Sequence, residues 1–290
     1  MNRQKETTKY LDPEYKQIQE THCACTSNSY EILPRFDLEW VDLKGYSKPV
    51  ADFGASYSPF SVEAYLNDVD IIPVDIAAGL TASQFVDMQA FNFTNPQLYE
   101  KYVRDPKIRE LVPEVTEELP SVTQFSNAIK KISSVVNSRS IAANISRLPM
   151  VENSFSIGLV YNVVPKHSLD LDSFLNQQLP ELLRVVEHKV YVYPLARHEI
   201  RYDCIVKSSE GKIVRKFLTA SEVNDSGVNI FKAIYVEVDP IYRNEEMCDN
   251  IRSVARERGF EMEFITPAKP RIFLSDFHEN VDNIVVFNKN

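Results

Sequence analysis

Two aspartates and a glycine stand where this chain could hold a nucleoside. Asp52 and Gly54 close an apolar run that begins at Val50, and Asp75 closes a second run that begins at Val69. In a nucleotide-binding α/β sheet, a glycine after the first strand lets the backbone approach the ligand. A carboxylate after the second strand accepts hydrogen bonds from the ribose. The spacing therefore predicts an adenosine-containing ligand between the ends of two adjacent parallel strands.

Both features also have a simpler interpretation. Asp-x-Gly occurs in many surface turns, and an acidic residue after a strand is often a helix cap or a solvated charge. A third segment, residues 140–165, shifts the balance between these interpretations through the resemblance that it carries. Its steps are Ser140-Ile-Ala-Ala, Asn144-Ile, Leu148-Pro, Asn153-Ser-Phe155-Ser and an apolar run that ends at Tyr161-Asn162.

This third segment resembles the middle of class I S-adenosylmethionine-dependent methyltransferases, and the likeness extends over about residues 50–286. It implies an α/β fold: a doubly wound, mostly parallel sheet with helices on both faces and an antiparallel last strand. We expect residues 50–290 to form this domain, with a helical insertion at 82–138 and a β-rich insertion at 197–243. Residues 1–49 are expected to form an N-terminal arm or lid.

The resemblance also implies a cofactor, S-adenosylmethionine, and a set of residues to bind it. The backbone from Gly54 to Ser56 would hold the methionine moiety, and Asp52 would order that loop or meet the ammonium group. Asp75 would accept hydrogen bonds from the ribose, while Ile76 and Asn144 would contact the adenine. The full predicted set is Asp52, Gly54, Ala55, Ser56, Asp75, Ile76, Asn144, Ile145 and Tyr161.

Catalysis of methyl transfer depends mainly on positioning and exclusion of water, so no obligatory triad is expected. The resemblance places Tyr161 and Asn162 beside the incoming nucleophile. A general base is needed only for a protonated nucleophile, and His167, His198 or Tyr161 could serve, although a lone histidine is more often structural. Asn162-Val-Val-Pro165 departs from the Asn/Asp-Pro-Pro-aromatic pattern of amine-methylating members, so the target atom stays open.

Two further departures bear on activity. The first turn has Ala55, Ser56 and Tyr57 where the family has further glycines, and Tyr57 could crowd the cofactor. Ser156 stands where the family usually has an aspartate after Phe155. These departures motivate an alternative, in which the chain kept the fold without catalysis and acts as a cofactor sensor or an interaction scaffold. A nicotinamide-dependent oxidoreductase is a third hypothesis, but it would need a GxGxxG turn that the sequence lacks.

Periodicity predicts the elements that would position these residues. Prolines separate the helices of the first insertion, Gly259 ends a helix near the C-terminus, and Trp40 is expected to pack in the core wall. The predicted helices are 82–91, 96–103, 123–136, 169–186 and 246–258, and the predicted later strands are 188–194, 259–265 and 283–287, with a β-hairpin around 207–211.

Composition narrows the classes of protein. The net charge of −9 argues against a general nucleic-acid binder, whose affinity depends on clustered Lys and Arg. No run of about 18 apolar residues could span a bilayer, and the charged start lacks the apolar core of a signal peptide, so we expect a cytoplasmic protein. His22, Cys23 and Cys25 could bind a metal with Cys204 or Cys248. Cys-x-Cys lacks the usual zinc-knuckle spacing, however, and we expect reduced thiols and no metal.

Overall fold

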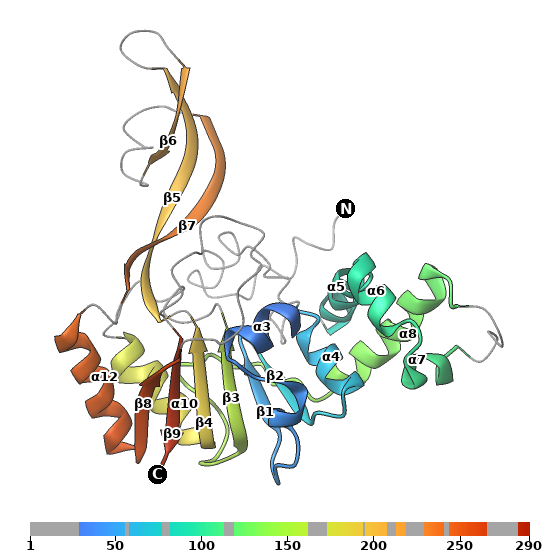
Figure 1. Cartoon of the computed structure of the whole chain (residues 1–290), viewed down its shortest axis with the longest axis horizontal. Helices are drawn as coiled ribbons and strands as arrows, with labels where there is room; N and C mark the ends of the chain where they lie inside the picture. The colour runs from blue at the N-terminus through green and yellow to red at the C-terminus, as the bar shows by residue number, and fades with distance from the viewer. Residues whose placement is uncertain are drawn as a thin grey trace.

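The computed structural model describes residues 29–55, 58–76, 82–112, 119–161, 173–193, 195–207, 213–218, 229–240, 244–265 and 284–290. Its centre is a six-stranded sheet in the order β2-β1-β3-β4-β9-β8 (Figure 1). The strands are β1 (Val50–Phe53), β2 (Ile71–Val74), β3 (Phe155–Tyr161), β4 (Val186–Tyr193), β8 (Phe260–Phe264) and β9 (Val285–Lys289).

The directions of these strands confirm the expected fold class. β1 pairs in parallel with both β2 and β3, and β3 pairs in parallel with β4. β9, the last strand in the sequence, runs antiparallel to β4 and β8. The next strand in the sequence, β2, lies on one side of β1, and β3 lies on the other side. The strand order therefore switches between β1 and β3. Open α/β sheets bind ligands at such a switch, beyond the carboxyl ends of the strands.

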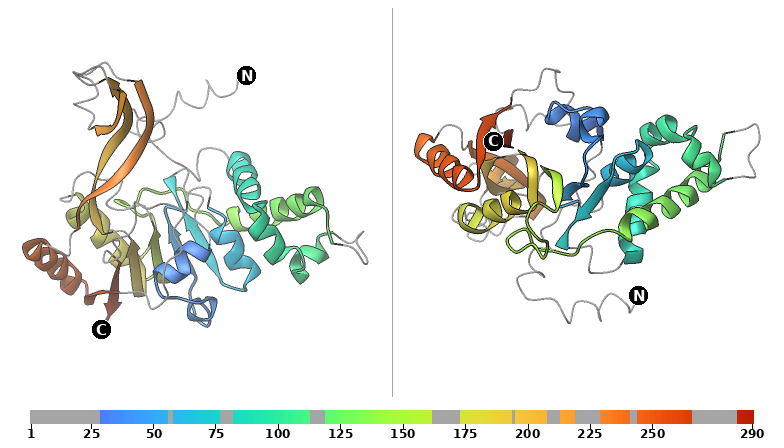
Figure 2. Two further views of the ribbon diagram at one scale, coloured as in Figure 1. Left: turned by 45° about the horizontal axis from the view of Figure 1, so that its top comes forward. Right: turned by 90° about the horizontal axis from the view of Figure 1, so that it is seen from below.

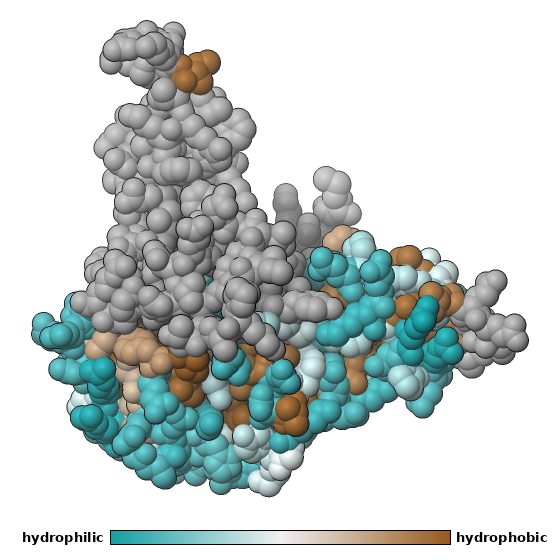
Figure 3. All heavy atoms as spheres, viewed as in Figure 1, coloured by the Kyte–Doolittle hydropathy of each residue, from teal (hydrophilic) through white to brown (hydrophobic). Residues whose placement is uncertain are grey.

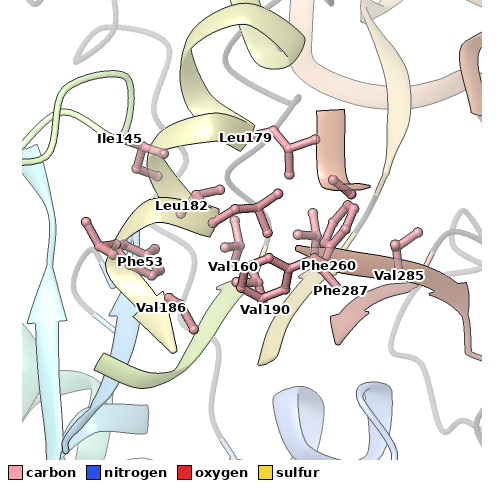
Figure 4. Close-up of a cluster of buried hydrophobic side chains, with 14 of the residues drawn as sticks. Phe53, Ile145, Val160, Leu179, Leu182, Val186, Val190, Phe260, Val285 and Phe287 are labelled. Carbon is pink, nitrogen blue, oxygen red and sulfur yellow. The ribbon is translucent and has the colours of Figure 1, made fainter. Parts of the chain in front are cut away.

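Helices cover both faces of the sheet, as a doubly wound fold requires. On one face, sheet residues pack with α10 (Leu179–Val185) and α12 (Glu245–Glu257). Figure 4 shows this cluster, with Phe53 and Ile145 at one end and Phe260 and Val285 at the other. On the opposite face, alternate residues of the same strands pack with α3 (Ser29–Arg35) and α4 (Phe60–Leu66). Figure 2 shows α3 and α10 on the two sides of the sheet.

A third core lies beside β2, where α5 to α8 gather (Figure 1). Three of these helices start where the sequence provides a cap: Asn95 and Asp105 cap helices that begin with proline, and Ser121 forms a capping box with Gln124. The helices are α5 (Ala82–Phe93), α6 (Pro96–Tyr102), α7 (Pro106–Glu110) and α8 (Val122–Asn137). The three helices predicted here are confirmed, while the division of the chain into insertions stays a prediction.

A separate three-stranded sheet projects from the main body in Figure 1, in the order β6-β5-β7. The strands β5 (Ala196–Lys207) and β6 (Ile213–Leu218) are antiparallel, which confirms the predicted hairpin. β7 (Asn229–Pro240) pairs antiparallel with β5 along almost its whole length and was not predicted. The run Ala233-Ile-Tyr-Val236 within β7 is rich in β-branched and aromatic residues, as is typical of strands, so this part of β7 did carry a local signal.

Two glycines act where their sequence positions suggested. Gly259 has a φ of +78° directly after α12, so it ends that helix in the left-handed region that favours glycine. Gly158 lies in the middle of β3, and a Cβ there would sit 2.9 Å from Cε2 of Phe53 and 3.0 Å from Cγ2 of Val186. Gly158 therefore lets the Phe53 ring lie directly against β3.

The later predicted elements are confirmed with small shifts of their ends, as is usual for element boundaries. The predicted helix 169–186 is seen from Ser173 as a π-helical segment η4 (Phe174–Gln178) followed by α10. The helix α3 and the 3-10 helix η2 (Trp40–Leu43) were not predicted.

Hydrophilic residues cover much of the described surface in the view of Figure 3. Among the described residues, no helix is long and apolar enough to cross a membrane.

Candidate functional site

The carboxyl ends of β1 and β2 lie side by side. Phe53 is opposite Val74 in the parallel register, so Gly54 follows on one strand and Asp75 on the other. The Gly54 N–H donates to the Val74 carbonyl over 2.7 Å, and its φ of +73° lies in the region that favours glycine. The glycine bend and the carboxylate predicted from the sequence are therefore brought together.

Asp75 itself is fixed by the next chain segment across the sheet edge. Its N–H donates to the Ile141 carbonyl over 3.0 Å, and the Ile141 N–H donates to the Pro73 carbonyl over 2.9 Å. These two bonds make a parallel bridge between Val74 and Ile141, which takes the place of a further edge strand. Asp75 and Ile76 are partly exposed at this edge, and Ala55 is buried.

Asp52 is a buried carboxylate on the α4 side of β1, one residue before the last of that strand. Its Oδ2 accepts a hydrogen bond from Oγ of Ser61 over 2.8 Å, and its side chain is almost fully buried. Burial raises the pKa of Asp52 to about 7; the Ser61 hydrogen bond opposes this shift, and the negative charge of Asp75 adds to it. Among the described residues, the charge that contributes to this shift is the negative charge of Asp75.

The predicted adenine loop follows Ile141. Asn144 is exposed, and its Oδ1 accepts the Ser146 N–H over 2.9 Å in a local turn. Ile145 is buried and packs in the core cluster shown in Figure 4, next to Phe53. The loop is held to α10 because Glu181 accepts the Leu148 N–H over 2.9 Å. Contact of Asn144 and Ile145 with an adenine ring stays a prediction.

Two tyrosines end the strands on the other side of the switch. Tyr161 ends β3 and is in register with Tyr193, which ends β4. Their rings are stacked, with centroids 5.4 Å apart and an angle of 26° between the planes. In the β1–β3 register Phe53 is opposite Val160, so Tyr161 stands at the level of Gly54. A row therefore crosses the carboxyl edge of the sheet: Asp75, Gly54, Tyr161 and Tyr193.

The helix α3 brings a buried arginine to the tyrosine end of this row. Arg35, the last residue of α3, has its Cζ 4.0 Å from the ring centroid of Tyr193 and 5.9 Å from that of Tyr161. Phe36 meets the edge of the Tyr161 ring at a centroid distance of 6.1 Å. The side chain of Arg35 is 4% exposed.

A buried glutamate fixes the other end of α3. Glu63 of α4 accepts hydrogen bonds from the N–H and the Oγ of Ser29, each over 2.6 Å, and from the hydroxyl of Tyr102 over 2.9 Å. Lys101 lies 3.7 Å from the same carboxylate. Burial raises the pKa of Glu63, and the hydrogen bonds from Ser29 lower it in part. Since α4 follows the Gly54 turn, Glu63 ties α3 to the segment that would hold the cofactor.

Several predicted residues lie outside the part of the chain that the structure describes, or have only their backbone described. Ser56, Asn162 and His167 are outside the described residues, as is Tyr57, so its predicted crowding of the site is untested. His198 lies in β5, where only the backbone pairing with Glu237 is described. The roles predicted for these residues stay predictions.

Two residues singled out from the sequence have structural contacts. Ser156 is fully buried and its Oγ accepts the Lys48 N–H over 3.2 Å, so it holds the chain that leads into β1. Trp40 stacks on Phe60 at 5.3 Å, as expected for a residue of the core wall. Cys248 is buried, and no group of three or more His, Cys, Asp or Glu side chains that could hold a metal is found among the described residues.

Sequence reasoning missed four residues that build this edge: Ser61, Glu63, Arg35 and Tyr193. A charged residue inside the apolar run Phe60-Ser-Val-Glu-Ala was a signal that Glu63 is buried with partners, because an unpaired buried charge is costly. Arg35 also lies among apolar residues, beside Leu33 and Phe36, but its contact with Tyr193 arises only in the tertiary fold and could not be read from the sequence.

Comparisons with known proteins give low similarity. No protein-family model and no curated protein match the sequence. Solved structures that align with the chain include the methyltransferase CcbJ from Streptomyces caelestis, at 10% identity, a TM-score of 0.44 and coverage of 89% of this chain and 95% of that one. The sugar N-methyltransferase KedS8 from a Streptoalloteichus species aligns at 11% identity and a TM-score of 0.39, covering 96% of this chain and 94% of that one.

A methyltransferase from Bacteroides fragilis, solved in complex with S-adenosyl-L-homocysteine, aligns at 9% identity and a TM-score of 0.35, covering 89% of this chain and 76% of that one. Similarities this low assign no cofactor and no acceptor to this chain. The fold class rests on the order and directions of its own strands.

Proposed function

We propose that this chain binds S-adenosylmethionine at the carboxyl ends of β1 and β2 and transfers its methyl group to a small-molecule or protein acceptor. The observation that carries the proposal is the buried Asp52 carboxylate, whose pKa is raised to about 7, with the negative charge of Asp75 adding to that shift. A buried carboxylate is costly, and a cationic ligand group would relieve that cost. S-adenosylmethionine carries a sulfonium and an ammonium group.

The same charges argue against the nicotinamide alternative. A dinucleotide would bring an anionic pyrophosphate to the turn at Gly54, close to the buried carboxylate of Asp52. Pyrophosphate sites rely on a glycine-rich turn and a helix N-terminus that together favour negative charge. The raised pKa of Asp52 indicates instead that the environment already disfavours one negative charge.

Each residue of the β1 and β2 ends then has a role that its position allows. The Gly54 bend lets backbone approach the methionine moiety, and Asp52 would orient that bend or pair with the ammonium group. Asp75 would accept hydrogen bonds from the ribose, and Ile76 would lie against the adenine, with Asn144 and Ile145 as further adenine contacts. The remaining residues of the predicted set are Ala55, Ser56 and Tyr161.

The cofactor, when bound, supplies a methyl group on a positively charged sulfur, which needs no further activation. The chain's own contribution is to align the acceptor with that group and to exclude water. Tyr161 and Asn162 would form the wall between cofactor and acceptor. His167 would remove a proton only if the acceptor atom carries one at the time of attack.

A second candidate function is a noncatalytic cofactor sensor or interaction scaffold. Ala55 favours it, because this residue is buried at 2% exposure where the family pattern has a further glycine. A cofactor must therefore fit against a methyl group in a crowded turn. The acceptor, and the cytoplasmic location expected from the sequence, stay predictions.

Calorimetric titration with S-adenosylmethionine, S-adenosylhomocysteine and NAD⁺ tests the proposal, followed by a screen for transfer of a tritiated methyl group to candidate acceptors. We expect the first two ligands to bind, NAD⁺ not to bind, and an acceptor to become labelled. Binding without labelling of any acceptor would favour the sensor. Failure of both adenosyl ligands to bind would overturn the proposal.

A further inference from the structure

The segment 141–150 joins the edge of the sheet to α10, and it carries the two residues predicted to contact the adenine, Asn144 and Ile145. Its first residue, Ile141, makes two backbone hydrogen bonds with the end of β2, one of them donated by the N–H of Asp75. Only two residues separate Ile141 from Asn144. The segment therefore sets how far the predicted adenine contacts lie from the predicted ribose contact.

A short turn follows Ile141 and is closed by its own hydrogen bonds. The Arg147 N–H donates to the Asn144 carbonyl over 2.9 Å, and the Ser146 N–H donates to Oδ1 of Asn144 over 2.9 Å. Apolar contacts attach the turn to the helix below, because Ile145 is buried in the cluster that includes Leu182 of α10 (Figure 4). Apolar contacts are not directional, so the exact place of the turn depends on the polar contacts beside it.

Two side chains of α10, Glu181 and Arg184, bind the backbone directly after the turn. Arg184 donates from Nη1 to the Met150 carbonyl over 2.7 Å and from Nη2 to the Leu148 carbonyl over 3.0 Å. Glu181 accepts the Leu148 N–H at Oε2 over 2.9 Å. The two side chains also bind each other, Nε to Oε1 and Nη2 to Oε2, each over 2.8 Å. We call this pair the α10 clamp.

The α10 clamp differs from an ordinary surface ion pair, which contributes little and fixes no neighbouring segment. Two bonds to Glu181 hold the planar guanidinium of Arg184 in one orientation, and its other N–H groups reach two carbonyls. The exposed fraction of the side chain is 20% for Arg184 and 23% for Glu181. The backbone carbonyl of Arg184 also accepts the Asn153 N–H over 2.9 Å, just before β3. The path from the turn to the sheet is thus fixed to α10.

We propose that Glu181 and Arg184 are positioning residues for the base of the adenosyl ligand, since they hold the turn with Asn144 and Ile145 in place beside Asp75. This inference rests on the proposed function and deepens it by assigning recognition of the base to a segment that α10 fixes. The effect of the clamp passes through the backbone of residues 148–150. Contacts that are already ordered cost less free energy on binding, so the clamp should raise affinity for the base.

The probes are S-adenosylhomocysteine and S-inosylhomocysteine, which differ only in the base. The inosyl compound has an oxygen and an N–H where adenine has its amino group and an unprotonated ring nitrogen. Because Oδ1 of Asn144 accepts the Ser146 N–H, its amide cannot invert without losing that bond, so it does not suit both bases equally. We expect calorimetry to show that the unmodified chain prefers the adenosyl compound by about tenfold.

The variants are Arg184→Met, Arg184→Lys and Glu181→Gln. Arg184→Met is expected to weaken binding of S-adenosylhomocysteine by about tenfold and to reduce the preference for adenine to about threefold or less. Arg184→Lys keeps the charge without the planar fork and should give an intermediate loss. Arg184→Lys and Glu181→Gln keep the length or shape of the side chain, so they remain informative if the methionine variant does not fold.

The matched control is Arg252→Met, which removes an ion pair of the same i,i+3 spacing from α12, at 2.9 Å from Asp249. It is expected to bind both compounds as the unmodified chain does. Amide hydrogen exchange on the ligand-free chain checks the clamp itself. The Leu148 N–H, which Glu181 accepts, should exchange faster in Arg184→Met and Glu181→Gln than in the control. Unchanged exchange in both variants would contradict the clamp.

The ratio of the two affinities separates a positioning role from a purely structural one. An equal loss of affinity for both compounds in Arg184→Met, with the preference intact, would assign the pair to the fold alone and overturn the proposal. Full affinity and full preference in that variant would also overturn it. Either result leaves the proposed function standing if the unmodified chain binds S-adenosylhomocysteine. If the unmodified chain binds neither compound, the proposed function fails and the positioning role fails with it.

Discussion

The two halves of the carboxyl edge are built from the same kind of strand end but hold opposite charges. At β1 and β2, a glycine bend lies between two carboxylates, and burial raises the pKa of Asp52 to about 7. At β3 and β4, two stacked tyrosines lie under a buried guanidinium. The two ends of the edge therefore differ in the sign of their buried charge, negative at Asp52 and positive at Arg35.

Removing Glu63 should cause the largest loss of stability. It should act mainly on the β3 and β4 end of the edge, the arginine half, because Glu63 holds the helix that carries Arg35. Glu63→Ala leaves the Ser29 N–H, its hydroxyl and the Tyr102 hydroxyl without their acceptor. Since each unsatisfied buried donor costs about 1–3 kcal/mol, we expect the free energy of unfolding to fall by about 3 kcal/mol in urea titrations. Glu110→Ala, an exposed glutamate on α7, is the control. A loss no greater than in that control would contradict the role given to Glu63.

Gly158→Ala should disturb both halves together, because Gly158 lies in the sheet beneath them. Its new Cβ would meet the Phe53 ring at 2.9 Å and Val186 at 3.0 Å, so the core must shift. Overpacking of this kind costs roughly 1–3 kcal/mol, measured as a lower midpoint of urea unfolding with an unchanged slope. Ser154→Ala, just before β3, is a control outside the core. An unchanged midpoint would mean that Phe53 relaxes without cost.

Asp75→Ala should weaken ligand binding only at the β1 and β2 end of the edge, the carboxylate half. We expect the Kd for S-adenosylmethionine to rise at least tenfold, because a hydrogen-bond partner of the ribose would be lost. Asp70→Ala is a matched control, since Asp70 precedes the same strand at its opposite end and pairs with Arg139 at 2.6 Å on the surface. Calorimetry measures the Kd for S-adenosylmethionine in both variants. Equal affinity in Asp75→Ala and the unmodified chain would remove Asp75 from the site.

The pH dependence of cofactor affinity should reveal Asp52. Its folded pKa of about 7 lies above the value of 3.8 expected when it is solvated, so a cation binds best when the group is ionised above pH 7. We expect affinity for S-adenosylmethionine to fall several-fold between pH 8 and pH 6, and Asp52→Asn to lose that dependence. An identical pH profile in the variant would argue that Asp52 does not face the ligand.

The raised pKa of Asp52 also makes the stability of the ligand-free chain depend on pH. Because the folded chain binds more protons than the unfolded chain between pH 3.8 and about 7, the contribution of Asp52 to the free energy of unfolding falls as pH rises through that range. Asp52→Asn should therefore flatten this part of the stability profile, as measured by urea titration at several pH values.

The carboxylate half could be predicted from the sequence because its signals are local. An apolar run followed by Gly54, and a second run followed by Asp75, define the two strand ends, and parallel pairing then brings them together. The helix-Gly259-strand step and the helices beside β2 were also local patterns. They depend on capping and periodicity within about 15 residues, and the structure confirms them.

The arginine half could not be predicted in the same way. The helix α3 has only seven residues and contains Pro34, so its intrinsic propensity is low and its stability comes from packing. Its contacts join Ser29 to Glu63 and Arg35 to Tyr193, across sequence separations that no local pattern reports. Of the candidates for the reacting centre, Tyr161 lies in the described row, while Asn162 and His167 stay untested.

Titration of the Asp52 carboxyl carbon by ¹³C NMR, assigned by comparison with Asp52→Asn, tests most directly whether a cation binds at the β1 and β2 ends. Without ligand, the Asp52 resonance should titrate near pH 7. With saturating S-adenosylmethionine, the midpoint should move well below that value, because the bound positive charge favours the ionised form. A midpoint that saturating ligand leaves unchanged would contradict the assignment of this edge to a cationic cofactor.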